Sequence, residues 1–245
     1  MGELIAVLSG KGGTGKTSVC AGIASALAFQ GESVLCIDCD VGLRNLDIAL
    51  GLSDTGCLSF LDVCNGSYTL ADAPQHPDFP MLRFLTAPMG CAATAINADA
   101  FAAMLQQAKD QFSYVFLDAP AGIEAGFSLA ARQADRILLV TGPDPAAVRD
   151  VTQAADVLEL MGKKNIRLIV NRIHKKLASA AKTTVDDIMD RSGLPLMGVV
   201  PEDSAVTLAA VYKKPLLLYN RKSAAAAACC RIARRLQGYH TPVFL

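Results

Sequence analysis

The sequence predicts an α/β fold in which a single domain is built on a mostly parallel sheet with helices on both faces. Short apolar runs alternate with helical patterns along the chain, an arrangement that is typical of parallel sheets buried between helices. Glycines or carboxylates follow several of these runs, at the strand ends where open α/β sheets bind ligands. No linker, repeat or low-complexity tract divides the 245 residues, so we expect one domain.

Seven apolar runs are predicted as strands, because each is short and is bounded by turn or helix signals. They are residues 4–8, 33–37, 81–85, 114–118, 136–141, 166–171 and 196–200. Helices are expected at 18–28, 97–111, from 144 onward, 184–192, from 201 onward and 223–236. Gly31 marks the end of the first helix, Asn97 caps another, and Asp144 followed by Pro145 begins a third. Residues 51–80 are expected to form short helices and loops.

The first strand leads into a glycine-rich loop that fits G-x-x-x-x-G-K-[ST], the phosphate-binding loop of nucleotide hydrolases. Glycines let backbone N–H groups surround a polyphosphate that side chains would block. Lys16 can reach the β- and γ-phosphates, Thr17 can offer its hydroxyl to Mg²⁺, and the following helix adds the positive end of its dipole. We therefore expect a P-loop NTPase domain whose nucleotide contacts include Gly10, Lys11, Gly12, Gly13, Thr14, Gly15, Lys16, Thr17 and Ser18.

Carboxylates follow two further predicted strands. Asp38 and Asp40 come at the end of the second strand, and Asp118 ends the run 114–118 in the manner of a Walker B motif. Carboxylates at this edge can hold the shell of a Mg²⁺ ion and orient an attacking water. A polar loop with capping acids is the alternative for the first pair.

The residues after the strand 166–171 bear on the choice of base. Guanine hydrolases place N-K-x-D at this position, whereas Asn171-Arg172-Ile173-His174 lacks the closing Asp. Adenine is therefore favoured, with a loop asparagine satisfied by its own neighbours as the alternative.

Composition narrows the class of protein further. Twenty-three basic residues balance 23 acidic ones, so no overall field draws the chain to nucleic acid or acidic lipid. No run approaches the roughly 18 apolar residues of a membrane span, and no export signal precedes the first strand, so a cytoplasmic protein is expected. Eight cysteines are scattered without a framework. Cys36 and Cys39 have C-x-x-C spacing, but a strand that ends in acids explains them better than a redox or metal site.

Lys11-Gly12-Gly13-Thr14-Gly15-Lys16-Thr17 resembles the deviant Walker A loop of the MinD/ParA ATPase family, which carries an early lysine such as Lys11. The stretches 38–47 and 119–124 resemble switch I and switch II of the MinD branch, and residues 201–203 match its I-P-E-D element. The resemblance extends from Leu4 to about Leu236, so we expect an ATPase domain at 1–238 and a short tail at 239–245.

The resemblance implies a role for each matching residue. Lys11 would reach across a dimer to the partner's nucleotide, Asp150 would meet this lysine, and Asp40 would activate the attacking water. A glycine N–H of the stretch 119–124 would approach the γ-phosphate. The implied catalytic set is Lys11, Lys16 and Asp40, the metal set is Thr17, Asp38 and Asp118, and the set beside adenine is Asn171, Pro201 and Asp203.

The resemblance also implies a cellular role. It suggests an ATP- and Mg²⁺-dependent homodimer that acts in division-site placement, binds ADP after hydrolysis, and works with MinC- and MinE-like proteins. Such a protein would be cytoplasmic and peripheral at the inner face of the cell membrane. Members of this branch bind the membrane with a basic amphipathic helix, and residues 238–245 are too few to form one and include Pro242.

Two alternatives of the same superfamily remain. A ParA-like DNA-partitioning ATPase would bind duplex through basic pairs, although neutral net charge disfavours strong phosphate binding. These pairs are Lys163-Lys164, Lys175-Lys176, Lys213-Lys214 and Arg221-Lys222. The second alternative is a flagellar-number regulator or a maturation ATPase that delivers metal.

Overall fold

The fold is organised around one seven-stranded sheet, in the order β3-β2-β4-β1-β5-β6-β7, with every pairing parallel. The computed structural model describes residues 1–41, 43–53, 57–89, 96–174 and 184–243. The strands are β1 (Glu3–Leu8), β2 (Val34–Asp38), β3 (Leu82–Leu85), β4 (Tyr114–Asp118), β5 (Arg136–Thr141), β6 (Ile166–Ile173) and β7 (Leu196–Pro201). All seven predicted strands are confirmed, and the expected α/β architecture with them.

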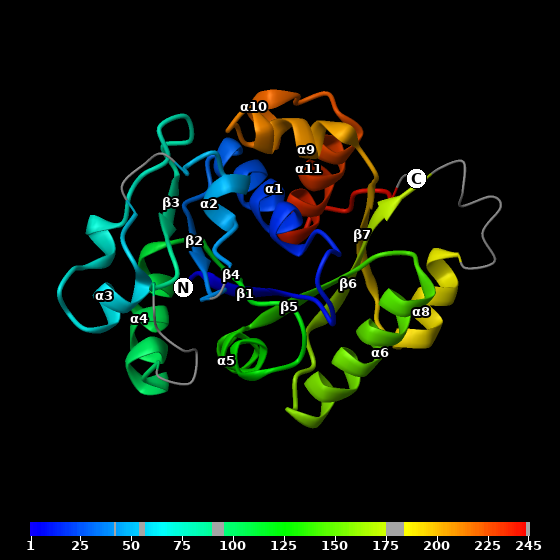
Figure 1. Ribbon diagram of the computed structural model, residues 1–245, viewed down its shortest axis with the longest axis horizontal. Coiled ribbons are helices and arrows are strands. Elements are labelled where there is room, and N and C mark those ends of the chain that lie inside the picture. Colours follow the sequence, from blue (N-terminus) through cyan, green and yellow to red (C-terminus); the bar gives the residue numbers. More distant parts are fainter. Residues whose placement is uncertain (42, 54–56, 90–95, 175–183, 244–245) are drawn as a thin grey trace.

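Helices cover both faces of this sheet (Figure 1). On one face lie α1 (Lys16–Phe29), α2 (Leu46–Ala49), α9 (Ser204–Val211), α10 (Leu216–Tyr219) and α11 (Ala224–Leu236). On the other lie α3 (Phe60–Cys64), α4 (Ala98–Gln111), α5 (Ala125–Gln133), α6 (Pro145–Leu160) and α8 (Val185–Ser192). A short 3-10 turn, η1 (Leu70–Asp72), joins α3 to β3. Because strand residues alternate between faces, the apolar core is divided into two clusters by the sheet.

The capping residues begin their helices as the sequence predicts. Asn97 accepts hydrogen bonds from the backbone N–H groups of Asp99 and Ala100, and Asp144 accepts one from Ala147. Gly31 adopts a left-handed φ of 93°, which ends α1 at little conformational cost. Helix α5 was not predicted, because its N-cap residue Glu124 is not one of the usual capping types and makes no side-chain cap.

The carboxyl ends of the strands form the edge that carries most of the predicted site residues. The P loop follows β1, Asp38 and Asp118 end β2 and β4 in register with each other, and Asn171 lies near the end of β6. Gly42 of the switch I stretch, the pair Lys175 and Lys176, and the last two residues lie outside the described residues. No helix within the described residues is both long and apolar enough to span a bilayer.

Candidate nucleotide site

The P loop is held in shape by close packing at two glycines. A Cβ on Gly10 would collide with the backbone carbonyl of Asp150 on α6, and a Cβ on Gly15 would collide with the side-chain amide nitrogen Nδ2 of Asn171. Gly13 and Gly15 also have left-handed φ angles of 80° and 81°. By contrast, a Cβ on Gly12 would meet nothing within 4 Å. The loop is therefore fixed underneath and open above, as a backbone cradle for phosphates requires.

Lys16 lies inside this site. Its side chain is only 7% exposed, and its Nζ donates to Asp118 Oδ1 at 2.5 Å. Nζ also donates to the hydroxyl of Thr17 at 3.3 Å. Thr14 Oγ1 is buried without a hydrogen-bond partner in the described part of the chain. A buried polar atom is costly when unpaired, so the loop presents an unsatisfied group that a phosphate oxygen can engage.

Asp38 organises the loop that follows β2. Its carboxylate is fully buried and accepts hydrogen bonds from the backbone N–H groups of Asp40, at 2.9 Å, and Leu46, at 3.1 Å. Asp40 itself is partly exposed and accepts from the N–H of Leu43 at 3.2 Å. Asp40 thus lies at the solvent side of the site, where water is available, while Asp38 fixes the loop that carries it.

Two buried carboxylates side by side create a demand for positive charge. Burial and then the neighbouring Asp118 carboxylate raise the pKa of Asp38 to about 7. Burial also raises the pKa of Asp118, although the ammonium of Lys16 and the hydroxyl of Thr17 oppose this shift. The charged form of both acids would be stabilised by a divalent cation beside them.

The donor set fits Mg²⁺ bound together with nucleotide. Within the described residues there is no group of three or more His, Cys, Asp or Glu that could enclose a metal. Thr17, Asp38 and Asp118 instead offer one hydroxyl and two carboxylates. Magnesium usually takes one or two carboxylates and completes its shell with water and phosphate oxygens, so these residues suit it.

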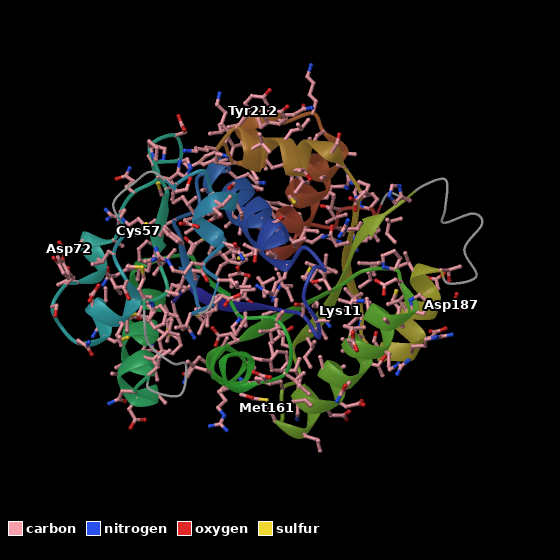
Figure 2. All side chains as sticks on the ribbon, in the orientation of Figure 1. Lys11, Cys57, Asp72, Met161, Asp187 and Tyr212 are labelled. Atoms are coloured by element: carbon pink, nitrogen blue, oxygen red, sulfur yellow. The ribbon has the colours of Figure 1, made fainter. Side chains whose placement is uncertain are left out.

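Lys11 differs from Lys16 in exposure and in its carboxylate partner. It lies at the start of the P loop (Figure 2) and is 32% exposed. Its Nζ donates to Asp144 Oδ1 at 2.8 Å. This hydrogen bond lowers the pKa of Asp144. The expectation that Asp150 meets Lys11 is wrong in this structure, because Gly10 packs against the backbone of Asp150 and the N-terminal end of α6 presents Asp144 instead. A cavity of about 360 Å³ is lined by both partners of this contact and also by Arg172 and Glu202.

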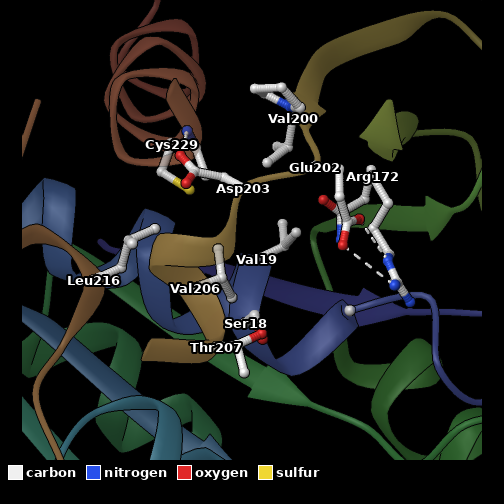
Figure 3. A pocket seen from close by; sticks show the side chains of 14 residues that line it. Ser18, Val19, Arg172, Val200, Glu202, Asp203, Val206, Thr207, Leu216 and Cys229 are labelled. Carbon is white, nitrogen blue, oxygen red and sulfur yellow. Dashed lines mark hydrogen bonds and ion pairs between the residues drawn. The ribbon is translucent and has the colours of Figure 1, made fainter. Parts of the chain in front are cut away.

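The residues predicted to lie beside the base line one pocket of about 230 Å³. Gly15, Ser18, Asn171, Pro201 and Asp203 all contribute to its wall (Figure 3). The remaining lining is largely apolar, as the flat face of a purine requires: Val19, Val200, Val206, Leu216, Ala225 and Cys229. The pocket adjoins the P loop through Gly15. A nucleotide can therefore place its phosphates on the loop and its base in the pocket.

Two of these residues already have protein partners. Asn171 donates from Nδ2 to the carbonyl of Thr14 at 2.8 Å, which ties the end of β6 to the P loop. The Asp203 carboxylate accepts from the N–H groups of Ala205 and Ala225, so it caps both α9 and the start of α11. These two residues shape the pocket, whether or not they also touch the base.

An ion pair at the mouth of this pocket was missed from the sequence. Arg172 and Glu202 form a two-pronged pair at 2.7 and 3.3 Å, and Arg172 also donates to the carbonyl of Gly13 at 3.2 Å (Figure 3). Arg172 has a left-handed φ of 62°, at a register irregularity between β6 and β7. The available signal was opposite charge directly after Asn171 and directly after Pro201, two residues already assigned to the base.

Two smaller expectations can also be placed. The N–H of Gly122 in the switch II stretch donates to the carbonyl of Ser9 at 3.1 Å, so in this conformation it is engaged by the protein. Cys36 and Cys39 are both buried and free, and burial raises the pKa of each thiol well above its usual range. The burial and the raised pKa of these thiols favour the strand interpretation of C-x-x-C over a redox site.

Comparisons with known proteins agree with this geometry. Residues 5–216 match the family model of the CobQ/CobB/MinD/ParA nucleotide binding domain. Septum site-determining protein MinD of Synechocystis is 38% identical over 244 residues, covering 99% of this chain and 92% of the relative.

Solved structures give the same result. A chain of the MinC:MinD cell division protein complex of Aquifex aeolicus superposes with a TM-score of 0.91 at 34% identity, covering 99% of this chain and 98% of that one. The septum site-determining protein MinD complexed with Mg-ADP, from Pyrococcus horikoshii, superposes with a TM-score of 0.83 at 27% identity over 96% of each chain. The chain thus belongs to the MinD/ParA family of P-loop ATPases, within its MinD branch.

Proposed function

We propose that this chain is a Mg²⁺-dependent ATPase that dimerises when ATP binds and acts as a nucleotide switch in division-site placement. In its ATP form it recruits a division-ring inhibitor such as MinC at the inner face of the cell membrane, and a MinE-like protein stimulates hydrolysis. The MinC:MinD complex of Aquifex aeolicus and the Mg-ADP complex of the Pyrococcus horikoshii MinD support the partner and the cofactor.

The observation that carries this proposal is the division of labour between the two lysines of the loop. Lys16 is buried against Asp118 and serves the chain's own site. Lys11 is partly exposed and pairs with Asp144, whose carboxylate is 54% exposed; within the described residues this is its one ion pair. An exposed ion pair of this kind contributes little stability, so Lys11 can exchange Asp144 for a stronger anion.

The triphosphate of a second copy is such an anion. Burying a tetraanionic nucleotide between two chains is costly unless opposite charge is fixed beside it, and Lys11 of each chain supplies that charge to the other. The γ-phosphate is present only in ATP, so the affinity between the two chains depends on the nucleotide. Hydrolysis then returns the chain to its monomeric form, with Asp40 orienting the attacking water.

Sedimentation of the purified protein tests the class of function directly. The protein is mixed with phospholipid vesicles plus MinC, or with duplex DNA, in the presence of ATP–Mg²⁺ or ADP–Mg²⁺. We expect it to sediment with MinC and vesicles in ATP and not in ADP. Sedimentation with DNA and not with vesicles would assign a ParA-like role instead. Equal behaviour in ATP and ADP would rule out the switch.

A further inference from the structure

A basic cavity lies at the edge of the sheet opposite the nucleotide site. Its volume is about 340 Å³, and it is bounded by residues at the amino ends of β5, β6 and β7 and at the end of α11. The P loop follows the carboxyl end of β1, so the two sites are separated by the length of the strands. The polar side chains of the cavity are Arg136, Asn165, Arg167, Arg235, Tyr239 and His240.

The three guanidinium groups come from three different elements. Arg136 is the first residue of β5, Arg167 is the second residue of β6, and Arg235 lies in the last turn of α11. All three are partly buried, and none of the residues that line the cavity is acidic. Like charges repel, so three guanidinium groups around one cavity need a balancing interaction.

Local partners account for two of the three. Arg136 pairs with Glu3 at 2.8 Å, and Arg235 donates to the carbonyl of Met197 at 2.7 Å while also complementing the dipole at the end of α11. The side chain of Arg167 has neither an ion pair nor a hydrogen bond among the described residues. Among the described residues, Arg136 thus has a carboxylate partner, Arg235 has a carbonyl partner, and the guanidinium of Arg167 has neither.

We propose that this cavity is a binding site for a phosphate-bearing ligand the size of a lipid headgroup or a small phosphate ester. Guanidinium groups match phosphate oxygens in a two-pronged geometry, and three of them provide enough donors for all the non-bridging oxygens. Asn165, Tyr239 and His240 add further polar groups around them. The volume is near the lower end of small-ligand pockets, about 300–1,000 Å³, which is too small to enclose duplex DNA.

The ligand would also organise the segment that follows α11. Tyr239 and His240 belong to this segment, and the N–H of Tyr239 donates to the carbonyl of Arg234 at 3.0 Å. A phosphate shared by Arg167 and His240 would fasten these residues to the start of β6. The site is remote from Lys16 and Asp118, so its occupancy does not require ATP.

Calorimetric titration of the ADP–Mg²⁺-saturated protein tests this site, because bound ADP blocks the competing phosphate site of the P loop. The probes for a free ligand are inorganic phosphate and glycerol 3-phosphate. The probe for a lipid headgroup is short-chain phosphatidylglycerol below its micelle concentration, with short-chain phosphatidylcholine as the neutral comparison. We expect saturable binding of at least one phosphate probe, and the probe that binds tightest identifies the source.

Two charge-matched variants distinguish the site from general surface charge. Arg167→Gln removes a cation that lines the cavity, whereas Lys164→Gln removes an exposed cation that does not. Arg167→Gln should weaken binding about tenfold or more, as expected for a lost charge-assisted hydrogen bond, and Lys164→Gln should not change it. His240→Ala should weaken binding without altering the ATPase rate. Absence of saturable binding for every probe, or equal weakening by both glutamine variants, would overturn the proposal.

Discussion

Asp38 and Asp118 are neighbouring buried carboxylates that perform different tasks. Asp118 anchors Lys16, and Asp38 accepts two backbone N–H groups that shape the loop carrying Asp40. Only Asp40 is partly exposed, so it is the acid placed to contact water. We therefore propose that Asp38 and Asp118 position the site and that Asp40 acts on the nucleophile.

Substitutions at Asp40 and Lys16 should have different effects. Asp40→Ala should retain ATP binding and lose turnover by about 10²–10⁴-fold, because a positioned base is lost while ground-state contacts remain. Lys16→Ala should weaken nucleotide binding itself about tenfold or more, since its ammonium contacts the phosphates before reaction. Nucleotide affinity and single-turnover hydrolysis measured for both variants separate the two roles. Full hydrolysis by Asp40→Ala would exclude it as the group that orients water.

Gly10 and Gly12 of the P loop allow the role of close packing to be tested with two matched substitutions. Gly10→Ala should lower the stability of the nucleotide-free protein by about 1–3 kcal/mol, because its methyl group would meet the backbone of Asp150. The methyl group added by Gly12→Ala would point into open space, so this variant should change stability by less than about 0.5 kcal/mol. Chemical denaturation of the nucleotide-free variants provides the comparison. Equal losses at both positions would mean that the close approach of α6 to the loop is not what fixes Gly10.

The end of β6 and the loop after β7 act together at the scale of elements. Asn171 ties β6 to the P loop, and Arg172 joins Gly13 to Glu202 on the neighbouring loop. The bulge between β6 and β7 makes both contacts available, because it allows the left-handed conformation of Arg172. The base pocket is thus connected to the phosphate cradle by three side chains.

This connection predicts the effect of removing Asn171. Asn171→Ala should weaken ATP and ADP binding about fivefold to tenfold, because the Thr14 carbonyl loses its partner and the loop loses a restraint. The missing guanine signature predicts that the unmodified protein prefers ATP to GTP. Competition binding with Mg²⁺ measures both effects. Equal affinity for ATP and GTP would show that Asn171 and the Pro201 loop do not select adenine.

Most of the molecule can be predicted from local sequence patterns, and the exceptions depend on tertiary contacts. The strands of a fully covered parallel sheet are continuous apolar runs, so their sequence signal is strong. Helix α5 lacks such a signal because Glu124 does not cap it through its side chain. Asp144, and not Asp150, pairs with Lys11 because of how α6 packs on Gly10, which no spacing in the sequence reveals. The same holds for Arg172 and Glu202, which are 30 residues apart.

At the scale of the whole molecule, we propose that Lys11 links the nucleotide state to assembly. Lys11 lies outside its own phosphate cradle, at an exposed contact that a second chain's triphosphate can replace. Removing it should therefore leave nucleotide binding intact, since Lys16 remains, while preventing the dimer. Asp40→Ala keeps ATP unhydrolysed and isolates the assembly step from turnover.

Analytical ultracentrifugation of Asp40→Ala and Lys11→Ala, each with ATP–Mg²⁺ and with ADP–Mg²⁺, is the most direct test of this claim. Asp40→Ala should be a dimer in ATP and a monomer in ADP. Lys11→Ala should bind both nucleotides, remain a monomer in each, and hydrolyse no ATP. A Lys11→Ala protein that dimerises in ATP and hydrolyses it at the normal rate would contradict the account.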